Sequence, residues 1–321
     1  MLTLFTTPKP MRGLVAITQR NALASWSKLP GCETLVFGDD AGAAELAAEV
    51  GARHAPRVAR NEHGTPLISD LFAQAERLSQ RDLLAYVNAD IILMSDFLKA
   101  VETTLETLRC ANAPRFLMVG RRCDVDLDSA WNFGSGNWED SLRQFAREHG
   151  VLHDHWGIDY LVYRRGTWGE IPPFAVGRPA WDNWMIYRAW ELGVPIVDAT
   201  EVVLAVHQNH DYTHVGLHMD RKAVWANAES RRNLKLAGIC GKYQFSIFNA
   251  THRLTREGLL PATDEGYLRQ RLASLPAYWP RIEFLARVYL KALRLAERLL
   301  PPARWRALVL ASTPARSRLS L

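Results

Sequence analysis

The sequence predicts an α/β fold in which helices flank a mixed, mainly parallel sheet. Short apolar runs that suit covered strands alternate with longer segments whose apolar residues recur at helical spacing. Up to residue 93 the order is strand, helix, strand, helix, loop, helix, strand, which favours parallel pairing through crossover helices. A chain of 321 residues, 48% of them hydrophobic and 23% charged, holds enough apolar material for a large core.

The positive charge of the chain is concentrated in its C-terminal segment. The formal net charge is +5, but residues 281–321 alone hold nine Lys and Arg against two Glu, a balance of +7. The preceding residues therefore carry −2, and such a body is not a general binder of polyanions. We expect no nucleic-acid partner.

The cysteines and the first residues both favour a cytoplasmic protein. The cysteines are widely spread without a close pair, which fits reduced thiols better than disulfides or a zinc site. No basic lead with a long apolar run opens the chain, and no apolar run is long enough to span a bilayer. The four cysteines are Cys32, Cys110, Cys123 and Cys240.

A first strand is predicted at residues 2–5. The loop after it contains Thr6, Thr7 and Lys9, whose hydroxyl and ammonium groups suit the base and phosphates of a nucleotide. The alternative is an ordinary connection that two prolines fix.

The next predicted elements are a helix at residues 17–29 and a strand at residues 34–37. This strand ends in Gly38, Asp39 and Asp40. A carboxylate there can hold a ribose hydroxyl, as in dinucleotide-binding folds, or it can cap the helix that follows at 41–50.

A polar loop at residues 60–66 comes next. Its Gly64 lets backbone approach a ligand, and Thr65 before Pro66 marks the start of a helix. Leu67 and Leu71 belong to the buried stripe of that helix.

A buried strand is predicted at residues 83–87, directly before Asn88-Ala89-Asp90. Ligands of open α/β sheets bind beyond the carboxyl ends of the strands, so Asp90 should stand in a cleft. Asn88, two residues earlier, lies on the same side of the chain. Such oxygen atoms are the ligands that a hard divalent cation prefers. The alternative is that Asn-Ala-Asp is only a turn.

Further along, Asp182 and Asn183 lie at the start of a predicted helix at 185–192, where the helix dipole favours an acid. A helix cap is the alternative role for Asp182. His207 and His210 follow a predicted strand at 202–206, and one imidazole there can bind a metal. The alternative is that one histidine caps and the other is solvated. Helices are also predicted at 96–108, 138–149 and 221–236, strands at 116–120, 160–163 and 194–197, and no element at 238–258.

The order of these features resembles the GT-A fold of nucleotide-sugar glycosyltransferases, over about residues 1–240. The features are Asn-Ala-Asp, then Trp181-Asp182-Asn183-Trp184, then a histidine after a strand. The resemblance implies a nucleotide-binding half at about 1–120, an acceptor half at about 121–240, and a C-terminal helical extension at 241–321.

The resemblance also implies roles for particular residues. Asp90 would bind Mn²⁺ or Mg²⁺ together with His207 or His210, and Asp182 would be the base if the reaction inverts the sugar. The donor is expected to be a UDP-sugar, and the acceptor a saccharide or glycolipid in polysaccharide or glycolipid synthesis. The nucleotide would contact Thr6, Thr7, Lys9, Asp39, Asp40, Gly64, Thr65 and Asn88, and the sugar or acceptor Asp159, Trp181 and Asn183.

Asn88 departs from the Asp-X-Asp motif of that family because an amide replaces the first carboxylate. One anionic ligand is therefore missing, which predicts weaker metal dependence. It also leaves open a catalytically inactive relative that binds a nucleotide or sugar.

Three other enzyme classes fit less well. A sugar-phosphate nucleotidyltransferase needs a glycine-rich loop after the first strand, and an oxidoreductase needs Gly-X-Gly-X-X-Gly there, but residues 6–10 contain no glycine. A metallohydrolase built on His207, His210 and Asp211 lacks a convincing further ligand.

A basic amphipathic helix is predicted at residues 281–300. Apolar residues recur along one side, and Arg and Lys lie between them. Such a helix is typical of peripheral contact with an anionic membrane, here the inner face of the cell membrane. The alternative is a helix that packs on the catalytic domain or on another subunit. The apolar residues are Ile282, Leu285, Tyr289, Leu293 and Leu300.

Overall fold

A computed structural model describes most of the chain. The described residues are 2–209, 225, 227–242, 244–277, 279–285, 288, 289, 291, 292 and 295. His210, residues 221–224 of the predicted helix at 221–236, and Leu293 and Leu300 of the basic helix lie outside them.

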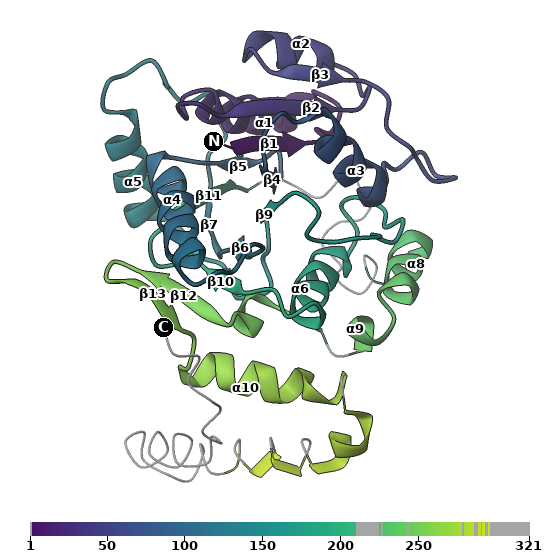
Figure 1. Ribbon diagram of the computed structural model, residues 1–321. Helices are drawn as coiled ribbons and strands as arrows, with labels where there is room; N and C mark the ends of the chain where they lie inside the picture. The colour runs from purple at the N-terminus through teal and green to yellow at the C-terminus, as the bar shows by residue number, and fades with distance from the viewer. Residues whose placement is uncertain are drawn as a thin grey trace.

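The predicted α/β fold with a mainly parallel sheet is confirmed (Figure 1). Nine strands form one sheet in the order β13-β12-β10-β6-β9-β4-β1-β2-β3. Neighbouring strands are parallel except where β9 pairs with β4 and β6, and where β13 pairs with β12. The strands are β1 Leu2–Thr6, β2 Glu33–Phe37, β3 Arg53–Ala55, β4 Leu83–Val87, β6 Leu117–Val119, β9 Tyr160–Arg164, β10 Ile196–Asp198, β12 His252–Thr255 and β13 Gly258–Pro261.

A second, four-stranded sheet has the order β5-β11-β7-β8. Its β11 pairs antiparallel with β5 and parallel with β7, so the chain after Asp90 meets segments more than thirty residues away. The strands are β5 Ile91–Ile92, β7 Arg122–Val125, β8 Val151–Leu152 and β11 Ala205–Gln208.

Helices cover both faces of the main sheet (Figure 1). The predicted helix at 138–149 has the predicted bounds, whereas the helix predicted at 17–29 runs from residue 13 to residue 26. Asp182 lies in the first turn of its helix, close to the predicted position. The helices are α1 Gly13–Trp26, α2 Ala43–Glu49, α3 Ile68–Leu78, α4 Ser95–Cys110, α5 Trp138–His149, α6 Trp181–Glu191, α8 Ala228–Ala237, α9 Ile239–Lys242 and α10 Glu265–Ser274.

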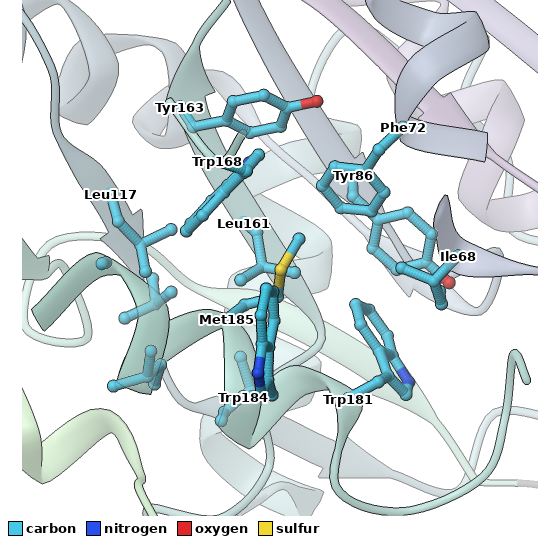
Figure 2. Close-up of a cluster of buried hydrophobic side chains, with 14 of the residues drawn as sticks. Ile68, Phe72, Tyr86, Leu117, Leu161, Tyr163, Trp168, Trp181, Trp184 and Met185 are labelled. Carbon is cyan, nitrogen blue, oxygen red and sulfur yellow. The ribbon is translucent and has the colours of Figure 1, made fainter. Parts of the chain in front are cut away.

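Buried apolar clusters hold the two faces of the main sheet. One lies between the sheet and helices α3 and α6, and the other between the sheet and helices α1 and α4. Figure 2 shows aromatic rings of the first cluster, where Phe72 stacks on Tyr86 and on Tyr163 with centroid distances of 5.8 and 5.5 Å. Burial of each such ring contributes about 2–3 kcal/mol, so this cluster fixes α6 and with it Asp182.

The main sheet continues beyond residue 240. The segment 238–258, for which the sequence predicted no element, contains α9, a short 3-10 helix (η2, Ile247–Asn249) and β12. Since β12 pairs with β10, part of the predicted C-terminal extension belongs to the sheet, and helix α10 follows β13. The division into nucleotide, acceptor and C-terminal parts stays a prediction.

Within the described residues, no helix is both long and apolar enough to cross a membrane. The four cysteines are free thiols, as the sequence predicted.

Candidate functional site

Asp90 lies in the turn between β4 and β5, at the end of the central strand. The N–H of Ile91 donates to the carbonyl of Asn88 over 3.1 Å, so Asn-Ala-Asp does form a turn. The backbone carbonyl of Asp90 accepts two hydrogen bonds from Gln208, from the backbone N–H at 3.3 Å and from Nε2 at 3.2 Å. The turn is therefore tied to β11, and the carboxylate stands at the sheet end as predicted.

His207 on β11 connects Asp90 with a second carboxylate, Asp124 on β7. The Nε2 atom of His207 is 3.8 Å from Oδ2 of Asp90, and its Nδ1 atom is 2.9 Å from Oδ1 of Asp124. When the carboxylate of Asp124 accepts the Nδ1 proton of a neutral His207, the Nε2 atom carries no proton and its lone pair points toward Asp90. This arrangement is typical of a histidine that binds a metal.

Asp124 is held by two further side chains. Its Oδ2 is 2.6 Å from Nδ1 of His153, and its Oδ1 is 2.8 Å from Nε of Arg122. Burial alone would raise the pKa of Asp124, but hydrogen bonds with His153 and His207 and the charge of Arg122 hold this pKa well below its ordinary value. Asp124 is thus a permanent anion beside His207.

The sequence interpretation missed Asp124 and His153 as site residues. Asp124 is visible only as one of several alternating acids after a strand, and His153 is 29 residues further along the chain. The pairing of β7 with β8 and β11 brings these residues together, and no local pattern indicates this pairing.

The described residues contain no group of three His, Cys, Asp or Glu that could hold a metal ion. They do provide the pair of Asp90 and His207, one carboxylate and one imidazole whose nearest ligand atoms are 3.8 Å apart. This donor set suits Mn²⁺ or Mg²⁺ only if oxygen atoms from a bound molecule complete the coordination.

Asp182 sits in the first turn of α6, where its Oδ1 accepts the N–H of Asn183 over 2.9 Å. Burial raises the pKa of Asp182 to about 7; that hydrogen bond opposes the rise, and the negative charge of Asp159 adds to it. A carboxyl group that titrates near neutral pH can accept a proton in a reaction.

The carboxylates of Asp90, Asp159 and Asp182 all act electrostatically on one buried tyrosine, Tyr86 on β4. Burial raises the pKa of Tyr86 strongly, and the charges of all three carboxylates raise it further. Since Val87 pairs with Tyr160 and Tyr86 packs on Trp181, the end of β4 and the starts of β9 and α6 meet in one place, as required if these acids form a single site.

Asp159 and Asn88 contact each other because β9 is antiparallel to β4. The start of β9 then lies beside the end of β4, and Nδ2 of Asn88 donates to Oδ1 of Asp159 over 2.7 Å. Arg122 also donates to both carboxylate oxygens of Asp159, at 3.0 and 3.1 Å. The amide nitrogen of Asn88 is thus engaged in positioning Asp159.

The predicted nucleotide-contacting residues of β1 and β2 lie together. The hydroxyl groups of Thr6 and Thr7 are buried and have no hydrogen-bond partner in the part of the chain that the structure describes. Gly38, with φ of +98°, lies so close that a Cβ added there would be 3.2 Å from Oγ1 of Thr7. Asp40 borders the same position, and its carboxylate is 2.8 Å from Arg60.

Arg60 also connects Asp39 with Gly64. Its NH2 is 2.8 Å from Oδ1 of Asp39, and its NH1 donates to the carbonyl of Gly64 over 2.8 Å. The loop at 60–66 is thereby fixed beside the end of β2.

Lys9 lies near Asp90 and Arg178. Burial lowers the pKa of Lys9, the charge of Asp90 raises it, and the charge of Arg178 lowers it. Arg178 forms an ion pair with Glu229 over 2.6 Å, and Glu229 accepts a hydrogen bond from Asn61 over 2.7 Å. Thr65 also donates to Glu229, which lowers the pKa of that acid. The sequence interpretation missed Arg178 and Glu229, which are 51 residues apart.

Trp181 and Asn183 face the interior. The ring of Trp181 packs edge-on against Tyr86 at a centroid distance of 5.0 Å (Figure 2), and Nδ2 of Asn183 donates to the carbonyl of Phe245 over 2.6 Å. Their role in binding a sugar or acceptor, like that of Asp159, stays a prediction.

No protein-family model and no curated protein matches this chain. Among solved structures, glucosyl-3-phosphoglycerate synthase from Mycobacterium tuberculosis, in complex with Mg²⁺ and UDP, is 16% identical and has a TM-score of 0.43, over 74% of this chain and 77% of that chain. The same enzyme with Mn²⁺, UDP-glucose and phosphoglyceric acid is 15% identical, with a TM-score of 0.42 over 74% and 80%. TarS 1–349 from S. aureus, in complex with UDP-GlcNAc, is 11% identical, with a TM-score of 0.49 over 97% and 90%. At such low identities and TM-scores, the functional argument rests on the residues of this chain.

Proposed function

We propose that this protein is a glycosyltransferase that moves a sugar from a nucleoside diphosphate donor to a hydroxyl group of an acceptor. The observation that carries the proposal is that Asp90, Asp159 and Asp182 converge at the end of β4, where Asn88 contacts Asp159 and Trp181 packs on Tyr86. Asp90 is paired there with an imidazole whose orientation Asp124 fixes. One acid suited to proton transfer beside one suited to a cation is what a diphosphate leaving group and a hydroxyl nucleophile require.

Asp182 is the proposed base. If the reaction inverts the sugar, Asp182 accepts the proton of the acceptor hydroxyl as this oxygen attacks the anomeric carbon. Its pKa of about 7 suits this role, because a base works best when its pKa is near the working pH. A retaining reaction would need a different use of the same acids.

Asp90 and His207 are the proposed protein ligands of Mn²⁺ or Mg²⁺, and His210 lies outside the described residues. When bound, the ion would offset the charge that builds up on the leaving diphosphate. Lys9 and Arg178 supply positive charge in the same region. Asn88 cannot add an anion and instead orients Asp159.

The nucleotide is proposed to lie along the ends of β1 and β2. The buried hydroxyls of Thr6 and Thr7 are available to a ligand, and Asp39, Asp40, Gly64 and Thr65 border them through Arg60 and Glu229. We propose a UDP-sugar as the donor and a saccharide or glycolipid as the acceptor, in polysaccharide or glycolipid synthesis in the cytoplasm.

Residues 281–300 are proposed to contact the inner face of the membrane. Phe284 and Leu285 are 74% and 64% exposed, and Val288 and Leu295 are exposed as well. Exposed apolar side chains within a basic segment favour an anionic lipid surface.

A thermal-shift experiment with nucleoside diphosphates and nucleotide sugars, each with Mn²⁺, Mg²⁺ or chelator, tests the donor site. A ligand that binds only the folded chain must raise the melting temperature. We expect a metal-dependent increase in melting temperature with one nucleotide, and Asp90→Ala should abolish it. The control is Asp128→Ala, a change of an exposed aspartate three residues after β7, which should leave the increase intact. No increase with any nucleotide would refute the transferase proposal.

A catalytically inactive relative is the second candidate, and Asn88 is the observation that favours it. The two candidates differ in turnover. Hydrolysis of the donor, measured with and without metal, is expected for the enzyme and not for the inactive relative.

A further inference from the structure

A small pocket of about 160 Å³ opens at the ends of β6 and β10, beside β12. Two arginines line it: Arg121 lies in the segment after β6, and Arg253 is on β12. Neither arginine has a role in the donor site proposed above. The other lining residues are Asp198, Thr200, Glu201, Phe248, Leu254 and Tyr267.

Arg121 has hydrogen-bonding capacity to spare. Its Nε donates to the carbonyl of His153 over 2.6 Å, and its backbone N–H donates to Oγ1 of Thr200 over 2.8 Å. Its two terminal nitrogens have no hydrogen-bond partner among the residues that the structure describes.

Arg253 likewise has a donor without a partner. Its Nε is buried and makes no hydrogen bond within the described part of the chain. Its NH1 is 3.8 Å from Glu201 and 3.4 Å from Asp264, distances at which the ion pairs are loose. A buried, unsatisfied N–H of a charged group costs free energy, and a ligand with acceptor oxygens would remove that cost.

Two acids line the pocket, Glu201 and Asp198, and Asp198 has hydrogen-bond partners other than the arginines. It accepts the backbone N–H of Thr200 over 2.9 Å, the hydroxyl of Thr200, and the hydroxyl of Tyr267 over 2.8 Å. The ring of Tyr267 packs on Phe248 at a centroid distance of 5.0 Å. The surroundings of Asp198 are therefore fixed, and the terminal nitrogens of Arg121 and the Nε of Arg253 remain available to a molecule that enters.

We propose that this pocket binds a carboxylate or phosphate group through Arg121 and Arg253. Planar guanidinium groups match such anions because their parallel N–H groups fit two oxygens at once. His153 links the pocket to the donor site, since its carbonyl accepts from Arg121 and its Nδ1 contacts Asp124. The anionic group belongs to the sugar acceptor or to a free anion, and the first of these sources rests on the function proposed above.

Binding of inorganic phosphate, measured by titration calorimetry on the full chain with Mg²⁺ and saturating UDP, tests the pocket. Under the function proposed above, UDP with its metal occupies the region of Lys9 and Arg178 and excludes phosphate from it. We expect Arg253→Gln and Arg121→Gln each to weaken phosphate binding about tenfold or more, as for loss of a charge-assisted hydrogen bond.

The matched control is Arg256→Gln, which removes the same charge from an exposed position in the turn between β12 and β13. It should leave the affinity for phosphate unchanged, and the conservative Arg253→Lys should retain part of it. Melting temperatures of all variants identify any that fail to fold. Equal affinities of Arg253→Gln and Arg256→Gln, or no phosphate binding by the unaltered chain, would overturn the proposal.

A second titration distinguishes the two sources of the anion. If it belongs to the acceptor, glucose 6-phosphate should bind about tenfold more tightly than inorganic phosphate, and Arg253→Gln should remove the difference. If the anion is free, glucose 6-phosphate should bind no better than phosphate, which overturns the acceptor source. If the unaltered chain binds phosphate but no nucleotide, only the transferase function is refuted. If it binds a nucleotide but no phosphate, only the pocket is refuted.

Discussion

Asp124 is the residue that fixes the orientation of the candidate metal ligand. It contacts His207, His153 and Arg122 with one carboxylate, and its pKa is held below the ordinary range. Because the Nδ1 atom of His207 is engaged in this way, its Nε2 atom can face Asp90.

Asp124→Asn should therefore lower the affinity for Mn²⁺ about 10- to 100-fold in the presence of the nucleotide, as outer carboxylates of metal-binding histidines usually do. The amide keeps the shape but cannot act as an anion. Titration of Mn²⁺ against the melting temperature measures the effect, with Asp128→Asn as the control. An unchanged affinity would mean that His207 does not bind the metal.

Asp182 should impose a pH dependence on transfer. Its carboxylate is the active form of a base, so kcat/KM should rise with pH and level off above about 7. Asp182→Asn should lower kcat by about 100-fold or more without a comparable change in donor binding. A pH profile unchanged by this substitution would exclude the role of base.

The same shift has a consequence for stability. The pKa of Asp182 in the folded chain lies above the unfolded value of about 3.9, so folding favours the protonated carboxyl group. The resulting stabilisation is complete below about pH 3.9 and is lost as the pH rises through about 7. Asp182→Asn should thus melt at a higher temperature than the unaltered chain at about pH 8, and the difference should shrink as the pH falls toward 4.

At the scale of residues, the sequence predicted that Asp90 and Thr7 lie just beyond the ends of strands, whereas their roles stay predictions. It did not predict partners that are distant in the chain. Arg178 and Glu229, or Asp124 and His153, meet only because strands and helices from separate segments pack together.

At the scale of elements, helix α6 begins with an unusual backbone conformation. Ala180, directly before the helix, has φ of +83°, a left-handed value that costs a residue with a Cβ about 1–2 kcal/mol. Asn233 holds this turn through the carbonyls of Ala175 and Pro179, at 3.0 and 3.3 Å. The strain is located two residues before Asp182, so the turn sets the direction of that carboxylate.

Ala180→Gly should relieve this strain and stabilise the fold by up to about 1 kcal/mol, after the larger entropy of an unfolded glycine is subtracted. The same substitution at Ala48, an exposed position in α2, should instead destabilise by about 1 kcal/mol. Urea unfolding of both variants measures the free energies. Equal destabilisation would show that Ala180 is not strained.

Element boundaries show which signals the sequence carries. The predicted helix at 138–149 was correct because the apolar residues Trp138, Leu142 and Phe145 recur at helical spacing along α5. The strands β12 and β13 were missed because neither is an apolar run: His252–Thr255 has one apolar residue, and Gly258–Pro261 begins with Gly and ends with Pro. The antiparallel direction of β9 was also not predicted, because direction depends on the connection and not on the strand sequence.

At the scale of the whole molecule, the exposed apolar residues after α10 predict membrane association. The full chain should float with vesicles of anionic lipid, and a chain that ends at Pro280 should not. A full-length variant with Phe284→Ser and Leu285→Ser tests the same surface without removing any chain, and vesicles of neutral lipid are the control. Flotation that neither change reduces would exclude this role for the segment.

The position of β9 has a consequence for synthesis on the ribosome. The edge of β4 that faces β9 stays unpaired until Tyr160–Arg164 has emerged, about 75 residues later. At the usual ~5–20 residues per second this takes roughly 4–15 s. A nascent chain of the first 120 residues therefore exposes the backbone of β4 and one face of its apolar side chains. We expect such a fragment to need a chaperone and to aggregate when expressed alone, so that residues 1–120 do not form an independent folding unit.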